Sequence, residues 1–161
     1  MAEGWPNYQP VGNPPPQRHG EELGIEAIIA SLGSGLPALI LHFAVTLSIL
    51  IAGVVIYEWI TPYPELKLVR EGNNAAAVAL SGAILSLAIP LAFSMAVSVS
   101  VLDILVWGGV TVCILLIVYR TIDFLLKDLP ARIENGEIGA AILLSSVKLA
   151  VAAITAAAVS G

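Results

Sequence analysis

"VREGNNAAAVALSGA", residues 69–83, is echoed later in the chain by "IENGEIGAAILLSSV", residues 133–147. In both stretches, charged residues and a glycine beside an asparagine lead into a run of small residues. Aligning Gly72 with Gly136 brings the two stretches into register, which predicts an internal duplication. The small residues that coincide are Ala76 with Ala140, Ala77 with Ala141 and Ser81 with Ser145.

The composition is typical of a membrane protein. Of the 161 residues, 58% are apolar and 12% are charged, whereas a soluble domain carries roughly 25% charged residues. The mean hydropathy is +0.91. A hydrocarbon core of about 30 Å takes about 20 helical residues to cross, and four apolar runs are long enough. We therefore predict an all-α integral membrane protein with spans at residues 36–59, 75–98, 104–126 and 138–160.

The four-helix transmembrane domain, residues 36–161, divides into repeat units 36–101 and 102–161. Each unit crosses the membrane twice, so the two helical hairpins have the same orientation and are related by an axis near the membrane normal. A short interfacial helix is expected within each connection, ended by Gly72 or Gly136 in a left-handed conformation. The neighbouring asparagines are expected to cap the helices that follow.

The N-terminal region divides into two parts. Residues 1–20 are rich in proline and are predicted to be a disordered tail. They contain no apolar core of a signal peptide. Residues 21–35 place apolar residues at helical spacing behind an acidic first turn, which predicts an interfacial helix that ends at residues 33–37.

The distribution of Lys and Arg predicts the orientation. These residues remain on the cytoplasmic side near membrane spans, and five of them lie around the two connections. Both termini are therefore expected on the outer, periplasmic side of a bacterial inner (plasma) membrane. The formal net charge of −5 and the absence of a basic run argue against nucleic acid as a partner. The five residues are Lys67, Arg70, Arg120, Lys127 and Arg132.

Small residues recur every fourth position in the second and fourth spans, as at Ala75, Ala79 and Ala83. This spacing allows helices to approach closely in lipid. A ligand groove is the alternative interpretation, but helix packing is the more common use. Because one such bundle is small and its Gly/Ala faces favour association, we also expect a homo-oligomer.

"ITPYPELKLVREGNNAAAVALSGAILSLAIPL", residues 60–91, followed by "DILVWGG", residues 103–109, is similar to a known family. Residues 36–161 resemble the small bacterial inner-membrane proteins grouped as domain of unknown function 350, the YjfL-like proteins. The resemblance implies a four-helix inner-membrane protein without an established activity. The chain departs from the family pattern at Lys148, where a small apolar residue is expected, and at Thr155, where an asparagine is expected.

Three positions break the symmetry of the duplication and are the first candidates for function. Lys148 lies about 15 Å into the fourth span at 1.5 Å per residue, where a charge is costly and often functional. Pro90 cannot donate to the Ser86 carbonyl and leaves that acceptor free. Together with His42, these residues are expected to form a polar layer near the bilayer midplane. The alternatives are a lysine paired with backbone carbonyls and a simple proline kink. The candidate layer comprises Lys148, His42, Ser86 and Pro90.

A second candidate is the connection between the first two spans. Its basic residues are suited to anionic lipid headgroups or to a protein partner, although a solvated loop has the same composition. Asp103 and Trp107 are expected to serve as a hairpin cap and an interfacial anchor. The candidate lipid or partner surface comprises Glu65, Lys67, Arg70 and Asn73.

No catalytic set of residues, phosphate-binding loop or metal-ligand cluster is apparent in the sequence, so we expect neither an enzyme nor a cofactor or metal site. Cys113 is the only cysteine and forms no intramolecular disulfide. The leading hypothesis is a non-enzymatic structural or interaction component of the cell envelope, with an envelope protein as a partner. The alternative is a small channel or transporter subunit that uses the polar layer.

Overall fold

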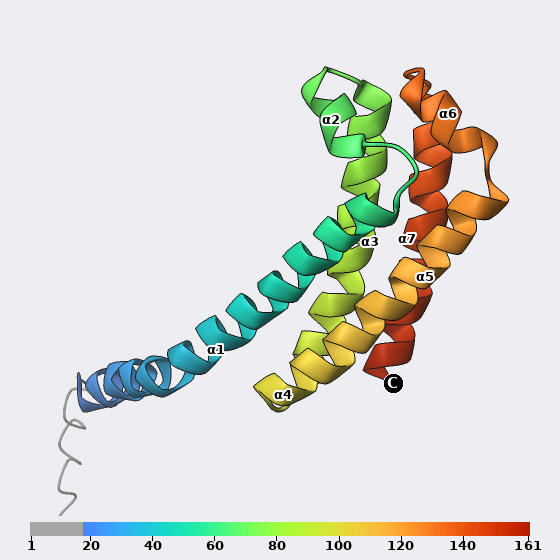
Figure 1. The fold of residues 1–161 in the computed structure, drawn as a ribbon. Coiled ribbons are helices and arrows are strands. Elements are labelled where there is room, and N and C mark those ends of the chain that lie inside the picture. The colour runs from blue at the N-terminus through green and yellow to red at the C-terminus, as the bar shows by residue number, and fades with distance from the viewer. Residues whose placement is uncertain (1–17) are drawn as a thin grey trace, which may run out of the picture. The chain divides into compact units, whose positions relative to one another are not determined.

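The computed structural model describes residues 18–161, with side chains from residue 24 onward, and every regular element in this range is a helix (Figure 1). The disorder predicted for the N-terminal tail falls mostly on residues 1–17, which lie outside the described part. The elements are α1 (Arg18–Ile60), α2 (Glu65–Arg70), α3 (Asn74–Val97), α4 (Val101–Asp103), η1 (Ile104–Gly108), α5 (Gly109–Leu125), α6 (Asp128–Glu134) and α7 (Ile138–Ser160).

Four helices in the described residues are long and apolar enough to cross a membrane. The predicted all-α fold with four spans is confirmed, and the boundaries agree within a few residues except at the start of the first span. The short π-helical turn η1 is continuous with α4 and α5, so these three elements form one span. The spans are Gly24–Ile60, Asn74–Val97, Val101–Leu125 and Ile138–Ser160.

The first span begins earlier than predicted because α1 does not end at residues 33–37. Gly33, Gly35 and Pro37 all lie inside the helix. Proline and glycine are tolerated within membrane helices, so these local signals do not stop α1. The helix expected at residues 21–35 is therefore the N-terminal part of α1 rather than a separate element. Of the described residues, those up to 38 and those from 39 onward fall into two compact units.

Helices α3 and α7 lie side by side (Figure 1) and are joined through small residues. A β-carbon added to Gly82 would collide with the side chain of Ser145 on α7. The Ser145 hydroxyl donates to the Val78 carbonyl at 3.2 Å. The small residues therefore serve helix packing, as predicted. Those buried along the two helices are Ala75, Ala76, Ala79, Ala83, Ala140, Ala141, Ala152 and Ala156.

The two connections end their short helices in the same way. Gly72 has φ +90° and Gly136 has φ +84°, a conformation in which only glycine is unstrained. After each glycine, the next residue donates its N–H five residues back, from Asn73 to Leu68 and from Glu137 to Arg132, at 2.9 Å in both cases. This is the Schellman pattern of helix termination, so the predicted left-handed glycines are confirmed.

The two connections differ in how the next helix begins. Asn73 caps α3 by accepting the Ala76 N–H at 3.0 Å. Its amide also donates to the carbonyls of Ile133 and Glu134, at 3.1 and 3.0 Å. Glu137 occupies the corresponding position before α7 and makes no side-chain cap. The expected asparagine cap is therefore present in the first connection only, where it also ties the two connections together.

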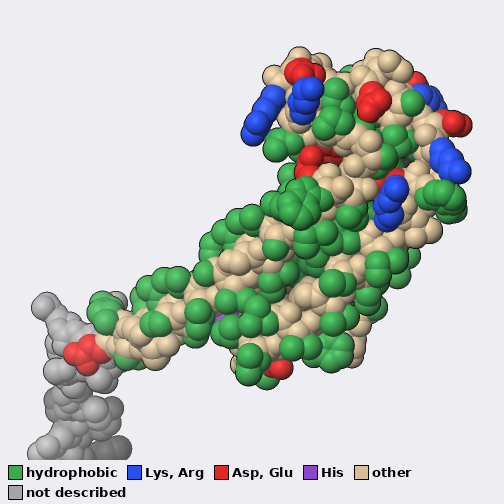
Figure 2. All heavy atoms as spheres, in the orientation of Figure 1, with side chains coloured by type: hydrophobic (Ala, Val, Ile, Leu, Met, Phe, Trp, Pro, Cys, Tyr) green, Lys and Arg blue, Asp and Glu red, His purple; other side chains and the backbone are tan. Residues whose placement is uncertain are grey.

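The end of the bundle that carries α2 and α6 is called the connection end. Charged side chains gather there in Figure 2, while the helices away from it present mainly hydrophobic side chains. Inside the bundle, an apolar core of leucine, valine and tyrosine side chains from α1, α3 and α5 gives way toward the connection end to an alanine-rich core. Tyr57 belongs to the first core and Tyr63 to the second.

Candidate functional site

Lys148 is the centre of a buried polar network. It lies ten residues into α7, and its side chain is 1% exposed. Because helical side chains lean toward the helix N-terminus, its ammonium lies on the connection-end side of its own backbone. The Nζ atom donates to the Tyr57 hydroxyl at 2.9 Å. It also lies 3.3 Å from Oδ1 of Asp123.

The network continues from α1 to α2. The Tyr57 hydroxyl accepts from Lys148 and donates in turn to Oε1 of Glu65 at 2.8 Å. Glu65 is the first residue of α2 and is 0% exposed. The chain folds back between Ile60 and Glu65, and the Glu65 N–H donates to the Tyr63 carbonyl at 3.0 Å. This turn carries an acidic residue from a polar connection into the interior of the bundle.

Asp123 lies two residues before the end of α5, and its side chain is 3% exposed. The distance from its Oδ1 to Nζ of Lys148 is that of an ion pair, but the two groups are not aligned as a hydrogen bond. The lysine is therefore held between a tyrosine from the first span and an aspartate from the third.

Two tyrosine rings flank the ammonium group. The Nζ atom of Lys148 lies 4.6 Å from the ring centroid of Tyr57 and 5.6 Å from that of Tyr119. Both distances are within the range of cation–π attraction. The sequence analysis predicted neither contact. The buried network comprises Tyr57, Tyr63, Glu65, Tyr119, Asp123 and Lys148.

Four polar atoms of the network have no hydrogen-bond partner, although buried polar groups are nearly always paired. Leaving such a group unpaired costs about 1–3 kcal/mol. These unpaired atoms lower the stability of the fold, so the polar groups of the network are not explained by stabilisation of the fold alone. The unpaired atoms are the hydroxyl groups of Tyr63 and Tyr119, Oε2 of Glu65 and Oδ1 of Asp123.

The electrostatics of Glu65 follow from its surroundings. Burial raises the pKa of this carboxyl above its usual value of 4.5, whereas the Tyr63 hydroxyl, the Lys148 charge and the Tyr57 hydroxyl act in the opposite direction. Burial is the largest effect, followed by Tyr63. Burial and the adjacent Glu65 also raise the pKa of Tyr63, so that its hydroxyl stays protonated.

The polar layer expected from the sequence is not assembled. Lys148 is buried within the bundle, but no hydrogen bond in the described residues joins it to the other three candidates. The Ser86 hydroxyl donates to the Ala83 carbonyl at 2.8 Å, and Pro90 is buried within a continuous α3. His42 lies on α1 fifteen residues before Tyr57, which is about 22 Å along a helix. It borders a separate surface cavity with Leu39, Phe43 and Met95.

The expected surface at the first connection is only partly present. Lys67 and Arg70 are exposed, and Asn73 is half-buried between the two connections. Glu65 was placed on this surface by the sequence analysis, which is wrong because the residue is buried. Lys67 lies 3.9 Å from Glu71, an exposed pair that contributes little to stability.

The counter-ion of Lys148, Asp123, was not predicted from the sequence. Asp123 lies inside the predicted third span, residues 104–126, and an acidic residue within a span points to a buried partner. The position of Asp123 within the span could therefore have predicted a buried ion pair. Glu65 carried no such signal, because an acidic residue in a polar connection ordinarily faces water.

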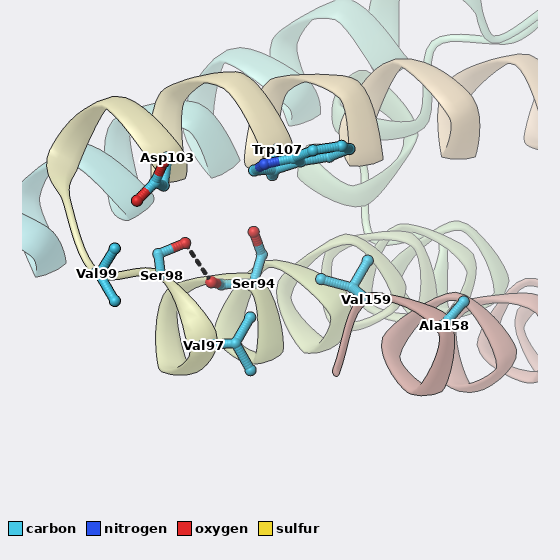
Figure 3. A pocket seen from close by; sticks show the side chains of 8 residues that line it. All are labelled: Ser94, Val97, Ser98, Val99, Asp103, Trp107, Ala158 and Val159. Carbon is cyan, nitrogen blue, oxygen red and sulfur yellow. Dashed lines mark hydrogen bonds between the residues drawn. The ribbon is translucent and has the colours of Figure 1, made fainter. Parts of the chain in front are cut away.

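A second cavity, of about 390 Å³, lies at the opposite end of the bundle (Figure 3). The hairpin cap predicted at Asp103 is Ser100 instead, whose hydroxyl accepts the Asp103 N–H at 3.2 Å and donates to the Asp103 carboxylate at 2.9 Å. The Ser94 hydroxyl is buried beside this cavity without a partner. The lining residues are Ser94, Val97, Ser98, Val99, Asp103, Trp107, Ala158 and Val159.

Four apolar spans that enclose a charged network define a multi-pass integral membrane protein. The family model described as Domain of Unknown Function (DUF350) matches residues 31–159, and the chain belongs to this family. It is similar to the UPF0719 inner membrane protein YjfL of Escherichia coli strain K12, with 31% identity over 109 residues, 68% of this chain and 83% of the relative. The protein of the same name from Escherichia coli O157:H7 matches to the same extent. No solved structure matches the chain.

These matches confirm the family resemblance seen in the sequence and agree with a multi-pass inner-membrane location. The family has no assigned function, so the buried network is the basis for proposing one.

Proposed function

We propose that this protein is a subunit of a small channel or transporter, in which the buried network controls passage at the connection end. The observation that carries this proposal is the burial of Lys148 between Asp123 and the Tyr57–Glu65 pair. Ionisable residues inside a membrane bundle are costly to bury and commonly mark ion or proton pathways.

Stability gives a poor explanation for the network. Replacing a buried ion pair with well-packed apolar residues is often neutral or stabilising. Here the ion pair is accompanied by three other buried polar atoms without hydrogen-bond partners, namely the hydroxyl groups of Tyr63 and Tyr119 and Oε2 of Glu65, each of which lowers stability. A cost of this kind is typical of groups that change partners or protonation during function.

The distribution of basic residues supports an orientation for this gate. Five Lys and Arg residues lie in or beside the two connections, which favours the cytoplasmic side for the connection end and the periplasmic side for both termini. The network then faces the cytoplasm, and the cavity beside Trp107 lies toward the periplasm.

Association of several copies is part of the proposal, because α3 and α7 of one chain pack closely against each other. The small residues between α3 and α7 are used within the chain. Others remain exposed on α7, at Ala150, Ala153 and Ala157. Only 6% of the span window in α1 is buried. These surfaces are suited to lipid and to neighbouring copies.

A structural or interaction role in the envelope is the second candidate. It is favoured by the exposed Lys67 and Arg70 on α2, which are available to an envelope protein or to anionic lipid headgroups. In this case the network would only hold the four spans in register. A protein partner that co-purifies through α2 and α6, in the absence of ion flux, supports this second candidate.

The test is ion flux into proteoliposomes, measured separately for H⁺, K⁺, Na⁺ and Cl⁻. We expect the wild-type protein to raise the flux of at least one ion above that of empty vesicles, and Lys148→Met to abolish the increase. Lys127→Met is the matched control, because Lys127 is exposed and its ammonium lies over the Phe124 ring, 4.2 Å from the centroid, outside the buried network. Wild-type flux equal to that of empty vesicles for all four ions would overturn the proposal.

A further inference from the structure

The charges of the buried network do not balance. It contains one cation, Lys148, and two carboxyl groups, Asp123 and Glu65, all almost inaccessible to water. The other ionisable groups in contact with Glu65 add no positive charge, because Tyr57 and Tyr63 are neutral and Glu58 is a further carboxyl. An uncompensated charge in such a place is strongly unfavourable. With both carboxyl groups ionised, the network lacks one positive charge.

We infer that the buried network binds one proton, held by the Glu65 carboxyl group. This inference deepens the proposed function by naming the proton as the ion to which the gate responds. Binding forms an O–H bond on Glu65 with a proton supplied by hydronium from the aqueous side and releases one water molecule. The resulting network contains an ammonium, a carboxylate and a neutral carboxylic acid.

The geometry assigns the proton to Glu65 rather than to Asp123. The Asp123 carboxylate lies 3.3 Å from the ammonium of Lys148 and is its direct counter-ion. Glu65 is separated from that ammonium by the Tyr57 hydroxyl, which bonds to both. A nearby positive charge favours the ionised form of a carboxyl group, and its effect weakens with distance. Of the two acids, Glu65 is therefore the one that takes up a proton.

The unpaired atoms support the same position. Oε1 of Glu65 accepts from Tyr57, whereas Oε2 has no partner. The Tyr63 hydroxyl is a neighbour of Glu65 and is also unpaired. The Tyr63 hydroxyl can donate to Oε2 of the ionised carboxylate, and a proton on Oε2 allows this oxygen to donate to the Tyr63 oxygen instead. Glu65 thus has a hydrogen-bond partner within reach in its protonated form as well.

A route for the proton to reach Glu65 is provided at the connection end. Glu58 is half-buried on the last turn of α1 and accepts the N–H of Leu66, the residue after Glu65, at 3.2 Å. Its charge also acts on the Glu65 carboxyl, although no hydrogen bond in the described residues joins the two groups. From Glu65, the hydrogen-bonded Tyr57 hydroxyl leads to Lys148. The acidic and polar groups thus extend from the half-buried Glu58 to the centre of the network.

The test is a pH titration of the full chain in lipid vesicles, followed by the infrared carbonyl stretch of protonated carboxylic acids. We expect the wild-type protein to show a buried carboxylic acid with a midpoint above pH 4.5, and Glu65→Gln to remove it. Glu137→Gln is the matched control, because Glu137 is exposed and pairs with Arg132 outside the network. A wild-type band that persists unchanged in Glu65→Gln would overturn the inference.

Two further variants test the charge balance through shifts in opposite directions. In Asp123→Asn, Glu65 becomes the only counter-ion of Lys148, so its midpoint is expected to fall by about one pH unit or more. In Lys148→Met, the positive charge is lost and the midpoint is expected to rise. Shifts in the same direction would contradict the inference. If either variant fails to fold, the comparison of wild type with Glu65→Gln still decides whether Glu65 holds the proton.

The outcomes separate this inference from the proposed function. Ion flux without a titrating Glu65 supports the channel or transporter and overturns the proton site. A titrating Glu65 without flux of any ion establishes the proton site and overturns the channel or transporter.

Discussion

The two connections of the molecule have the same backbone design but different buried chemistry. Glu65 on α2 aligns with Leu129 on α6, and both side chains are buried beneath their connection. Within the spans, Lys148 of α7 aligns with Ile84 of α3. In each aligned pair, one repeat unit has an apolar residue and the other has a charged residue. The residues that the two units share form the helices and turns, whereas the buried network is formed by charged residues that have no charged counterpart in the other unit.

The largest effect is expected when a charged residue of an aligned pair is replaced by its apolar counterpart. Lys148→Ile leaves the buried Asp123 and Glu65 without a cation, and removal of one partner of a buried pair costs about 3–5 kcal/mol. The triple variant Lys148→Ile, Glu65→Leu and Asp123→Asn removes all three charges and is expected to recover most of that loss. The measurement is the free energy of unfolding in mixed micelles. A triple variant that is no more stable than Lys148→Ile would show that the charges are needed for folding.

A smaller effect is expected from the two asparagines of the turns. Asn73→Ala removes the α3 cap and both bonds to the second connection, and a lost cap alone costs about 0.5–2 kcal/mol. Asn135→Ala is the matched change, because Asn135 is exposed and donates only to the Ala131 carbonyl four residues earlier, at 2.8 Å. The same unfolding measurement should show Asn73→Ala to be the more destabilising variant. Equal effects would mean that the bond between the connections contributes nothing.

The smallest effect, and the one with the clearest sign, is the pH dependence of stability. The pKa of Glu65 is raised by burial, so the folded chain binds more protons than the unfolded chain between pH 4.5 and the folded pKa. Stability from this group is therefore lost as the pH rises through that window. Glu65→Gln should remove this part of the pH dependence, as measured by unfolding at a series of pH values.

Glu137 in the other connection should have the opposite sign. Its hydrogen bond to Arg132 lowers the pKa of this carboxyl, so its contribution is present above pH 4.5 and is lost as the pH falls through the folded pKa. Arg132→Gln should flatten this acidic part of the profile. A profile in which both glutamates act in the same direction would contradict the contrast between the connections.

Much of the frame could be predicted from the sequence because its causes are local. The length of each apolar run predicts a membrane span, and a glycine next to an asparagine predicts the turn in each connection. The continuity of α1 through Pro37 was not predicted, because the tolerance of a membrane helix for proline overrides the soluble-protein rule. The asymmetry at Lys148 correctly identified the centre of the candidate site. Its partners were missed because Tyr57, Glu65 and Asp123 come from three other elements that only the tertiary fold brings together.

The missing side chain at Gly82 also determines how deep the lysine lies. Ser145 of α7 fits against the bare backbone of α3 at this glycine, and Lys148 follows one turn later on the same helix. If α7 slipped along α3 by a single turn, the ammonium would move about 5.4 Å along the membrane normal and lose contact with Tyr57 and Asp123. The close packing of Ser145 against Gly82 thus fixes the position of α7 along α3, and with it the depth of the Lys148 charge within the bilayer.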